Sequence, residues 1–328
     1  MKKILIYGSY GYTGTMITEH LVQMEQDIVI AGRNGMKLAE MGKNLNLPFR
    51  AFALGTAQNI DVVLKDFDIV LNCAGPFHRT AQPLMEAALR NNVHYLDVSA
   101  ELESYALAQK LSKEAEAKGI LLMPGCGGSV TMIGCLTAFA KKLIPNPEKA
   151  QVALHVTGSM SRGSAVSASE NVSTALIARR AHELEKLEDI SSVRFNFGNG
   201  FVDCTPVTLP DVITLWNEYN IPDITTYVHI SGAAFPTGDL ALLPDGPSKQ
   251  EREANRYQAA VHLKDKSGNE VRAVLNTVNG YAFTPMAAAL AVRHVSDDKF
   301  SAGFQTSFGL WGSDFVQSIP STTMEVLS

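Results

Sequence analysis

A glycine-rich segment near the start of the chain has the spacing of a phosphate-binding loop. Gly8-Ser-Tyr-Gly-Tyr-Thr-Gly14 directly follows the short apolar run Lys3–Tyr7. At a strand-to-helix turn, one such glycine permits the tight turn, one lets the backbone approach a pyrophosphate, and one lets the helix pack on the strand. A helix beginning near Tyr12 would point its N–H groups at the phosphates. We therefore predict that a dinucleotide contacts Gly8, Ser9, Tyr10, Gly11, Tyr12, Thr13 and Gly14.

The end of the second apolar run, Asp27–Ala31, indicates which dinucleotide binds. An NAD site places Asp or Glu at this point to bond the ribose 2′-hydroxyl. Here the chain continues as Gly-Arg-Asn, with a lysine one turn further on. A guanidinium can grip a 2′-phosphate with a fork of hydrogen bonds, and a lysine adds a point charge. We therefore predict NADP(H), bound by Arg33, Asn34 and Lys37; the alternative is a surface arginine beside a turn.

A third loop follows the apolar run Asp68–Asn72 and carries a Gly-Pro turn. A loop at the carboxyl end of a central strand should lie beside the nicotinamide ribose. The predicted cofactor contacts here are Asn72, Cys73, Ala74, Gly75 and Pro76. Cys73 is interpreted as a small core residue rather than a nucleophile.

Polar residues near the predicted nicotinamide end supply the candidates for chemistry. The catalytic candidates are His78, Asp97 and Glu101, and the candidate substrate contacts are Arg79, Ser99, Glu101, Arg162 and Ser164. An arginine and hydroxyls at a helix start would suit a carboxylate or phosphate on the substrate. Each candidate also has a structural interpretation: backbone capping for Asp97, an ion pair with Glu101 for Arg79, and helix capping for the serines. No tyrosine is followed by lysine four residues later, which argues against a standard short-chain ketoreductase.

Six short apolar runs alternate with helix-like segments up to about residue 124. Strands buried on both faces have this pattern, so we predict a Rossmann-type, doubly wound parallel sheet. Beyond it we predict a mixed α/β domain with an antiparallel sheet, a long helix over Ser164–Leu187 and a hairpin turn at Asp265–Asn269. Thr284 is predicted to cap a last long helix that returns the chain to the first domain.

Composition limits the partners. The net charge of −5 and the absence of a basic run argue against nucleic acid. No apolar stretch reaches membrane-spanning length and no signal peptide is evident, so a cytoplasmic protein is expected. The four cysteines form no CxxC pair, and no metal site is expected. They are Cys73, Cys126, Cys135 and Cys204.

With these motifs in this order, and with Tyr95-Leu-Asp-Val-Ser99, the chain resembles the saccharopine dehydrogenase-like oxidoreductases, a group that includes the trans-acting enoyl reductases. The resemblance implies an NAD(P)-binding Rossmann domain completed by the C-terminal segment, an inserted substrate domain, and often a homodimer. Many relatives carry acidic residues after the last Rossmann strand, whereas residues 125–134 contain no carboxylate. The resemblance therefore does not carry over activities that depend on those acids.

These inferences predict a division into a dinucleotide-binding domain, residues 1–124 with 284–328, and a substrate and dimerisation domain, residues 125–283. The substrate is expected in a cleft bounded by the candidate loops. The predicted function is NADPH-dependent hydride transfer to an imine, carbonyl or activated alkene of a small metabolite. The alternative is a non-catalytic NADP-binding sensor or scaffold.

Overall fold

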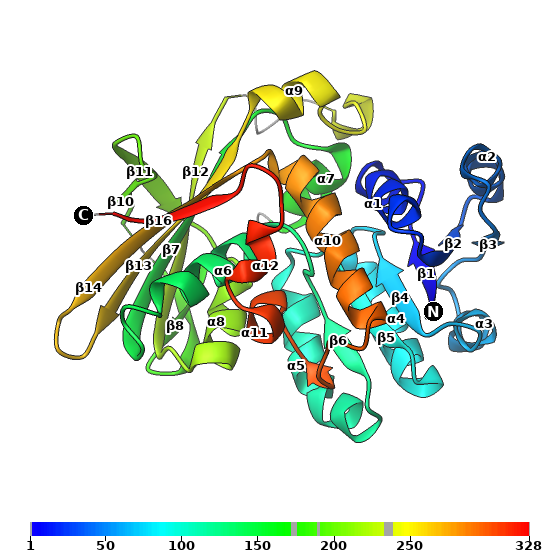
Figure 1. Ribbon diagram of the computed structural model, residues 1–328, viewed down its shortest axis with the longest axis horizontal. Helices are drawn as coiled ribbons and strands as arrows, with labels where there is room; N and C mark the ends of the chain where they lie inside the picture. The colour runs from blue at the N-terminus through cyan, green and yellow to red at the C-terminus, as the bar shows by residue number, and fades with distance from the viewer. Residues whose placement is uncertain (1, 172–175, 189–190, 233–238, 328) are drawn as a thin grey trace. The chain divides into compact units, whose positions relative to one another are not determined.

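The computed structural model describes residues 2–171, 176–188, 191–232 and 239–327 (Figure 1). The chain forms two compact units. The first unit comprises Met1–Gly127 and Thr284–Gln305, and the second comprises Gly128–Phe283 and Thr306–Ser328. The predicted first domain extended over residues 284–328, but the compact unit ends at Gln305. The reason is that the last strand of the chain pairs with a strand of the second unit.

A seven-stranded sheet forms the first unit, and all its neighbouring strands are parallel. This confirms the predicted doubly wound sheet. The strand order is β15 (Gly303–Phe304), β6 (Leu121–Met123), β5 (His94–Asp97), β4 (Ile69–Asn72), β1 (Lys3–Tyr7), β2 (Asp27–Gly32) and β3 (Phe49–Ala51). The direction of winding reverses between β1 and β4, and at such a point the loops at the carboxyl ends open a crevice for ligands.

Five helices of the first unit connect its strands. They are α1 (Tyr12–Gln23), α2 (Gly35–Leu45), α3 (Ala57–Leu64), α4 (Phe77–Asn91) and α5 (Leu102–Ala117). A further helix, α10 (Gly280–Ser296), carries the chain from the second unit back to the first. The prediction that Thr284 caps this helix was wrong. The helix begins four residues earlier, where the side chain of the buried Asn279 accepts the backbone N–H of Tyr281.

The second unit is built on a mixed nine-stranded sheet, in which β7 and β12 are parallel and the other pairs are antiparallel. Its strands are β7 (Pro147–Thr157), β8 (Leu176–Arg180), β9 (Glu183–Leu187), β10 (Val193–Asn196), β11 (Phe201–Pro206), β12 (Asp223–Ser231), β13 (Tyr257–Asp265), β14 (Glu270–Thr277) and β16 (Thr323–Leu327). The predicted hairpin turn joins β13 to β14, and the Asp265 carboxylate accepts backbone N–H groups from Ser267 and Asn269 within it.

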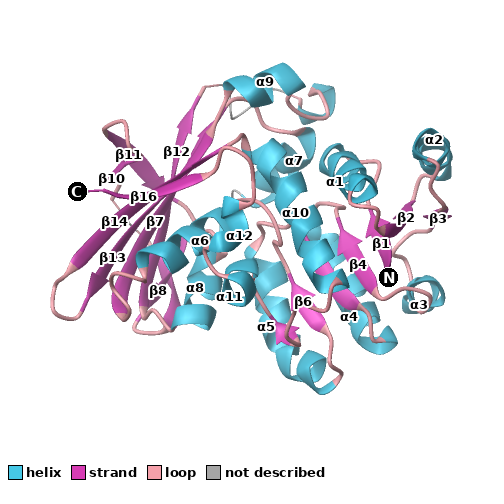
Figure 2. Cartoon of the chain, in the orientation of Figure 1, coloured by secondary structure: helices cyan, strands magenta, loops and turns pink. Residues whose placement is uncertain are grey.

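Helices cover part of this sheet (Figure 2). The helices of the second unit are α6 (Ser129–Ala140), α7 (Arg162–Asn171), α8 (Asp211–Tyr219), α9 (Lys249–Ala254), α11 (Ser307–Trp311), α12 (Asp314–Gln317) and the short 3-10 turn Leu240–Leu242. Helix α6 contacts β7, β13 and β14, while α8 contacts β8 and β12. Because nine residues of α6 are buried, this helix forms the centre of the unit's core.

The predicted long helix over Ser164–Leu187 was wrong. The structure has α7 up to Asn171 and then a β8–β9 hairpin, with residues 172–175 outside the described part. The hairpin turns at Ala181 and His182, which both have positive φ. The charged residues of β9, which fell within the predicted helix, lie on an exposed strand that pairs only with β8 among the described strands. Alternating charges tolerate either structure on a solvated surface, which explains the error.

Candidate functional site

The glycine loop joins β1 to α1 and is held against the end of β2. The backbone N–H groups of Gly8 and Ser9 both donate to the carbonyl of Ala31, at 2.8 and 3.3 Å. Gly8 has φ of +84°, and a Cβ atom there would fall 2.8 Å from the backbone nitrogen of Ala74. Both the backbone conformation and this close approach therefore require glycine. The same contact brings the glycine loop against the β4–α4 loop.

The other two glycines of the loop differ in what surrounds them. A Cβ atom on Gly14 would lie 2.3 Å from the carbonyl oxygen of Gly8, so this glycine is needed for packing of the helix. Gly11 has extended backbone geometry, with φ of −74° and ψ of 163°, and a Cβ atom would meet only the Gly8 oxygen, at 3.2 Å. Gly11 is the N-cap of α1 and supplies no capping side chain. The start of α1 therefore offers an anion-binding position next to a glycine that the fold itself does not strictly require.

The end of β2 leads into an open pocket. Its lining is Tyr10, Arg33, Asn34, Gly35, Met36 and Lys37. Arg33 and Lys37 are exposed, and Met36 is 83% exposed. The Asn34 side chain caps α2 by accepting the backbone N–H of Lys37 at 3.1 Å. Two cations and a capped helix start thus surround a surface depression, which is an arrangement suited to a phosphate.

At the end of β4, before the β4–α4 loop, the side chain of the predicted contact residue Asn72 is hydrogen-bonded within the fold. Asn72 is fully buried, donates to Thr80 and Tyr95 at 3.0 and 3.2 Å, and accepts the backbone N–H of Ala74. Burial, reinforced by the nearby Asp97 charge, raises the pKa of the Cys73 thiol. A protonated thiol is a poor nucleophile, so the chemistry available in this loop lies in its backbone.

Asp97, one of the three catalytic candidates, is fully buried at the end of β5. Its carboxylate accepts the backbone N–H groups of Ser99 and Gly125 at 2.9 and 2.8 Å and the hydroxyl of Tyr95 at 2.8 Å. Burial raises its pKa, while these hydrogen bonds act in the opposite direction. This geometry favours the capping interpretation of Asp97 over catalysis, and the neighbouring Ser99 is buried as well.

Glu101 lies across from the start of α4, and it is 6% exposed. Its two carboxylate oxygens accept the backbone N–H groups of Phe77 and His78, at 3.0 and 2.7 Å. The same carboxylate lies 3.6 Å from Nδ1 of His78. Glu101 therefore supplies the cap that Pro76, the N-cap residue of α4, cannot provide.

His78 is the catalytic candidate that the structure leaves most accessible, with 35% of its side chain exposed. Nε of Arg79 donates to Nε2 of His78 at 3.1 Å. A guanidinium can only donate, so Nε2 is the acceptor, and a neutral His78 carries its proton on Nδ1, towards Glu101. The structure thus brings three predicted residues together: His78, Arg79 and Glu101.

The remaining two substrate candidates lie at the start of α7 in the second unit. Arg162 forms an ion pair with Asp245 at 3.1 Å and donates to the carbonyl of Leu243 at 2.8 Å. Ser164 hydrogen-bonds to Ser161 through both its backbone N–H and its hydroxyl. The helix begins at Arg162, two residues before the predicted start at Ser164, and both polar side chains already have partners within the unit.

Sequence reasoning did not single out Gly32 or Met36, which lie at or beside the pocket after β2. The sequence signal that could have identified Gly32 is its position directly before Arg33, at the predicted end of the second strand. The described residues contain no group of three or more His, Cys, Asp or Glu that could hold a metal. Within the same described ranges, no helix combines the length and apolar character needed to cross a bilayer.

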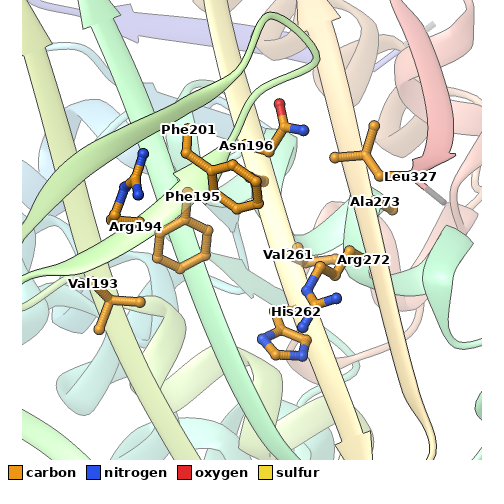
Figure 3. A pocket seen from close by; sticks show the side chains of 11 residues that line it. Val193, Arg194, Phe195, Asn196, Phe201, Val261, His262, Arg272, Ala273 and Leu327 are labelled. Carbon is orange, nitrogen blue, oxygen red and sulfur yellow. The ribbon is translucent and has the colours of Figure 1, made fainter.

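A small pocket of about 30 Å³ lies on the sheet of the second unit (Figure 3). Phe195 and Phe201 approach it from β10 and β11, while His262, Arg272 and Leu327 approach it from β13, β14 and β16. This volume has room for a water molecule or two but not for a metabolite, so it is not a substrate site.

The parallel strand order, the glycine loop and the position of the pocket lined by Arg33 and Lys37 together define a Rossmann-type dinucleotide-binding unit. Residues 4–123 match the family model of the saccharopine dehydrogenase NADP-binding domain. The expected cofactor class is thereby confirmed at the level of the matching domain, and so is the resemblance to saccharopine dehydrogenase-like oxidoreductases.

Curated relatives match a similar share of the chain. The human saccharopine dehydrogenase-like oxidoreductase is 25% identical over 144 residues, covering 38% of this chain and 34% of the relative. The trans-acting enoyl reductase of Mycobacterium leprae is 29% identical over 132 residues, covering 38% and 32%. The matched stretch is thus about a third of each relative's length.

Among solved structures, the saccharopine dehydrogenase (L-Glu forming) of Saccharomyces cerevisiae aligns with a TM-score of 0.66 and 13% identity, covering 100% of both chains. At this identity the match establishes the shared fold.

Proposed function

We propose that the chain is an NADPH-dependent oxidoreductase that transfers hydride to an imine, carbonyl or activated alkene of a small metabolite. The observation that carries the proposal is the combination of the α1 start beside Gly11 with the Arg33–Lys37 pocket at the end of the adjacent strand β2. NADP(H) carries phosphate at two separate points, and the first unit offers two anion-binding positions at one edge of its sheet.

The residues present fit this cofactor. A side chain on Gly11 would project into the space beside the start of α1, where the pyrophosphate would approach the backbone. Arg33 would hold the 2′-phosphate through its planar donors, with Lys37 as a second positive charge. When bound, NADPH supplies the hydride and the protein supplies position and protons.

His78 is the proposed proton donor for a carbonyl or imine substrate. When Arg79 turns from the ring to the substrate, a ring protonated on both nitrogens would donate its proton from Nε2 and keep Nδ1–H towards Glu101. It is the most accessible of the catalytic candidates and lies in the first turn of α4, where Glu101 accepts its backbone N–H and faces Nδ1 of its ring. Arg79, whose Nε contacts the ring, is proposed to attract an anionic substrate group. Glu101 is then a positioning residue, because its carboxylate is occupied by the start of α4.

NADPH oxidation should be measured with three substrate classes: amino acid and keto acid mixtures, aldehydes, and enoyl thioesters. Turnover with one class is expected, and His78→Gln should lower kcat at least about tenfold while leaving the NADPH Kd unchanged. Unchanged kcat in this variant would remove His78 from proton transfer.

Arg162→Ala should raise KM for the substrate without changing NADPH binding, if the exposed ion pair with Asp245 opens to a substrate anion.

A second candidate function is a non-catalytic NADP-binding sensor or scaffold. It is favoured by the structural use of two of the three catalytic candidates, since Asp97 and Glu101 are both occupied by backbone N–H groups. Tight NADPH binding without turnover on any substrate class would support this function over the first. A homodimer formed through the second unit, Gly128–Phe283 with Thr306–Ser328, as its substrate and dimerisation domain, and a cytoplasmic location are further parts of the proposal.

A further inference from the structure

The side chain of Tyr10, in the glycine loop, packs against the backbone of Gly32. An ideal Cβ atom on Gly32 would lie 2.5 Å from Cε1, 3.2 Å from Cζ and 3.4 Å from Cδ1 of the Tyr10 ring. The phenol ring therefore lies directly against the backbone of Gly32, at the end of β2. Gly32 does not have a positive φ, so its backbone suits any residue. What requires glycine at position 32 is the Tyr10 ring.

A cation also contacts the Tyr10 ring. Nζ of Lys37 lies 5.8 Å from the centroid of the Tyr10 ring, within the range of a cation–π contact. Tyr10, Arg33 and Lys37 all line the open pocket after β2. Burial raises the pKa of Tyr7 to about 12, with the charge of Tyr10 adding to the shift and that of Arg33 opposing it. The ring thus contacts both the Gly32 backbone and one of the two cations of the pocket.

We propose that Tyr10 is a specificity-determining residue whose ring, seated on Gly32, forms a wall of the 2′-phosphate subsite and holds Lys37 towards the ligand. The ligand class is a nucleotide with a 2′-phosphate on an adenosine ribose. This inference rests on the proposed function and adds a residue pair, Tyr10 and Gly32, that selects 2′-phosphorylated nucleotides over those with a free 2′-hydroxyl. An alanine at position 32 would push the ring off the strand and displace this wall.

The test uses the full chain and two probes that lack nicotinamide and differ only by the 2′-phosphate, 2′,5′-ADP and 5′-AMP, so it does not depend on catalysis. Titration calorimetry should show that Gly32→Ala weakens 2′,5′-ADP binding about tenfold, while 5′-AMP binding changes less than about twofold. Tyr10→Phe keeps the ring and should retain the selectivity. Tyr10→Ala should lose it, and adding Gly32→Ala to Tyr10→Ala should have no further effect.

Gly55→Ala is the matched control, because a Cβ atom on Gly55 meets nothing within 4 Å. It should leave both affinities unchanged. Selectivity retained in Gly32→Ala, or an equal loss on adding Gly32→Ala to Tyr10→Ala, would overturn the proposed role of the pair. Equal binding of the two probes by the wild type would overturn the 2′-phosphate subsite itself, and with it the NADP assignment. The two failures are therefore distinguishable.

Discussion

Two helices begin at the carboxyl ends of adjacent parallel strands in the first unit, and their starts are used differently. Helix α1 follows β1, and its N-cap residue Gly11 brings no side chain to the helix end. Helix α4 follows β4, and its first two N–H groups donate to the carboxylate of Glu101. Both helix ends carry the same partial positive charge. At α4 the protein itself supplies the anion, whereas at α1 the geometry suits an anion from a ligand.

The two helix starts show that the same partial positive charge can be capped by the protein itself or be left available to a ligand. A helix start next to a glycine loop can bind a ligand anion only if no side chain of the protein already caps it. At α4, the buried Glu101 carboxylate, which is 6% exposed, is such a cap. A third helix start, at α8 in the second unit, gives a further contrast. There Asp211 is fully buried and neither of its oxygens hydrogen-bonds to another described residue.

The largest effect is expected from blocking the start of α1. Gly11→Val should weaken NADPH binding at least about a hundredfold, because the branched side chain would occupy the approach to the pyrophosphate. The thermal unfolding midpoint should change little, since the Gly11 backbone suits any residue and a Cβ atom there has one close contact. Gly14→Ala is the comparison variant and should destabilise the fold, given the 2.3 Å approach of its Cβ atom to the Gly8 oxygen. Near-native affinity in Gly11→Val would mean that the phosphate site lies elsewhere.

Removing the cation after β2 should have the next largest effect. Arg33→Ala removes charge-assisted hydrogen bonds worth about 1.5–3 kcal/mol, so the Kd for NADPH should rise roughly ten- to a hundredfold. The Kd for NADH should stay nearly constant, because the ligand lacks the 2′-phosphate. Calorimetric titration with both dinucleotides measures this directly. A parallel loss for NADH would show that Arg33 acts on the fold or on a shared part of the cofactor.

The buried carboxyl of α8 predicts a pH dependence of stability. Burial raises the pKa of Asp211 from its usual value near 3.8 to about 8. The folded state then keeps this proton up to about pH 8 while the unfolded chain loses it near pH 4, so the contribution of Asp211 to stability falls as pH rises through that window. Relative to Asp211→Asn, the wild type should lose roughly 1.4 kcal/mol per pH unit there. Urea unfolding at pH 5, 6 and 7 measures the difference, and parallel pH profiles would contradict it.

The smallest effect is expected at the start of α4. Glu101→Gln keeps an acceptor oxygen but removes the charge, so the free energy of unfolding should fall by about 1–2 kcal/mol. NADPH affinity should remain near the wild-type value, because α1 and the Arg33 pocket are untouched. Chemical denaturation together with NADPH titration separates the two readouts. A large loss of affinity with unchanged stability would place Glu101 in the cofactor site and remove the contrast between the two helix starts.

Much of the first unit could be predicted from sequence because its strands are buried on both faces. Runs such as Lys3–Tyr7 and Asp27–Ala31 were located within a residue or two of the observed strands. The position of the glycine loop and of Arg33 follows from these strands, since a strand end fixes where the next loop begins. The predicted contacts at the loops are now placed in the fold, and their roles in binding stay predictions.

The second unit was less predictable for physical reasons. Strand β9 is exposed and charged, so it lacks the apolar periodicity that distinguishes a strand from a helix. The start of α10 depends on the Asn279 cap, and a threonine followed by proline further along the same helix gave a stronger local signal. The role of Asp97 depends on Gly125, 28 residues away, and no local pattern reveals such a contact.

The assignment of the Arg33–Lys37 pocket to the 2′-phosphate is tested most directly by the affinity of the wild-type chain for NADPH and for NADH, measured by calorimetry under identical ionic conditions. A site built from the α1 start and the Arg33–Lys37 pocket predicts NADPH binding at least about tenfold tighter than NADH. It also predicts that this preference weakens with added salt, because the pocket's cations are exposed. Equal affinities for the two dinucleotides, or no binding of either, would contradict the assignment of this pocket to the 2′-phosphate.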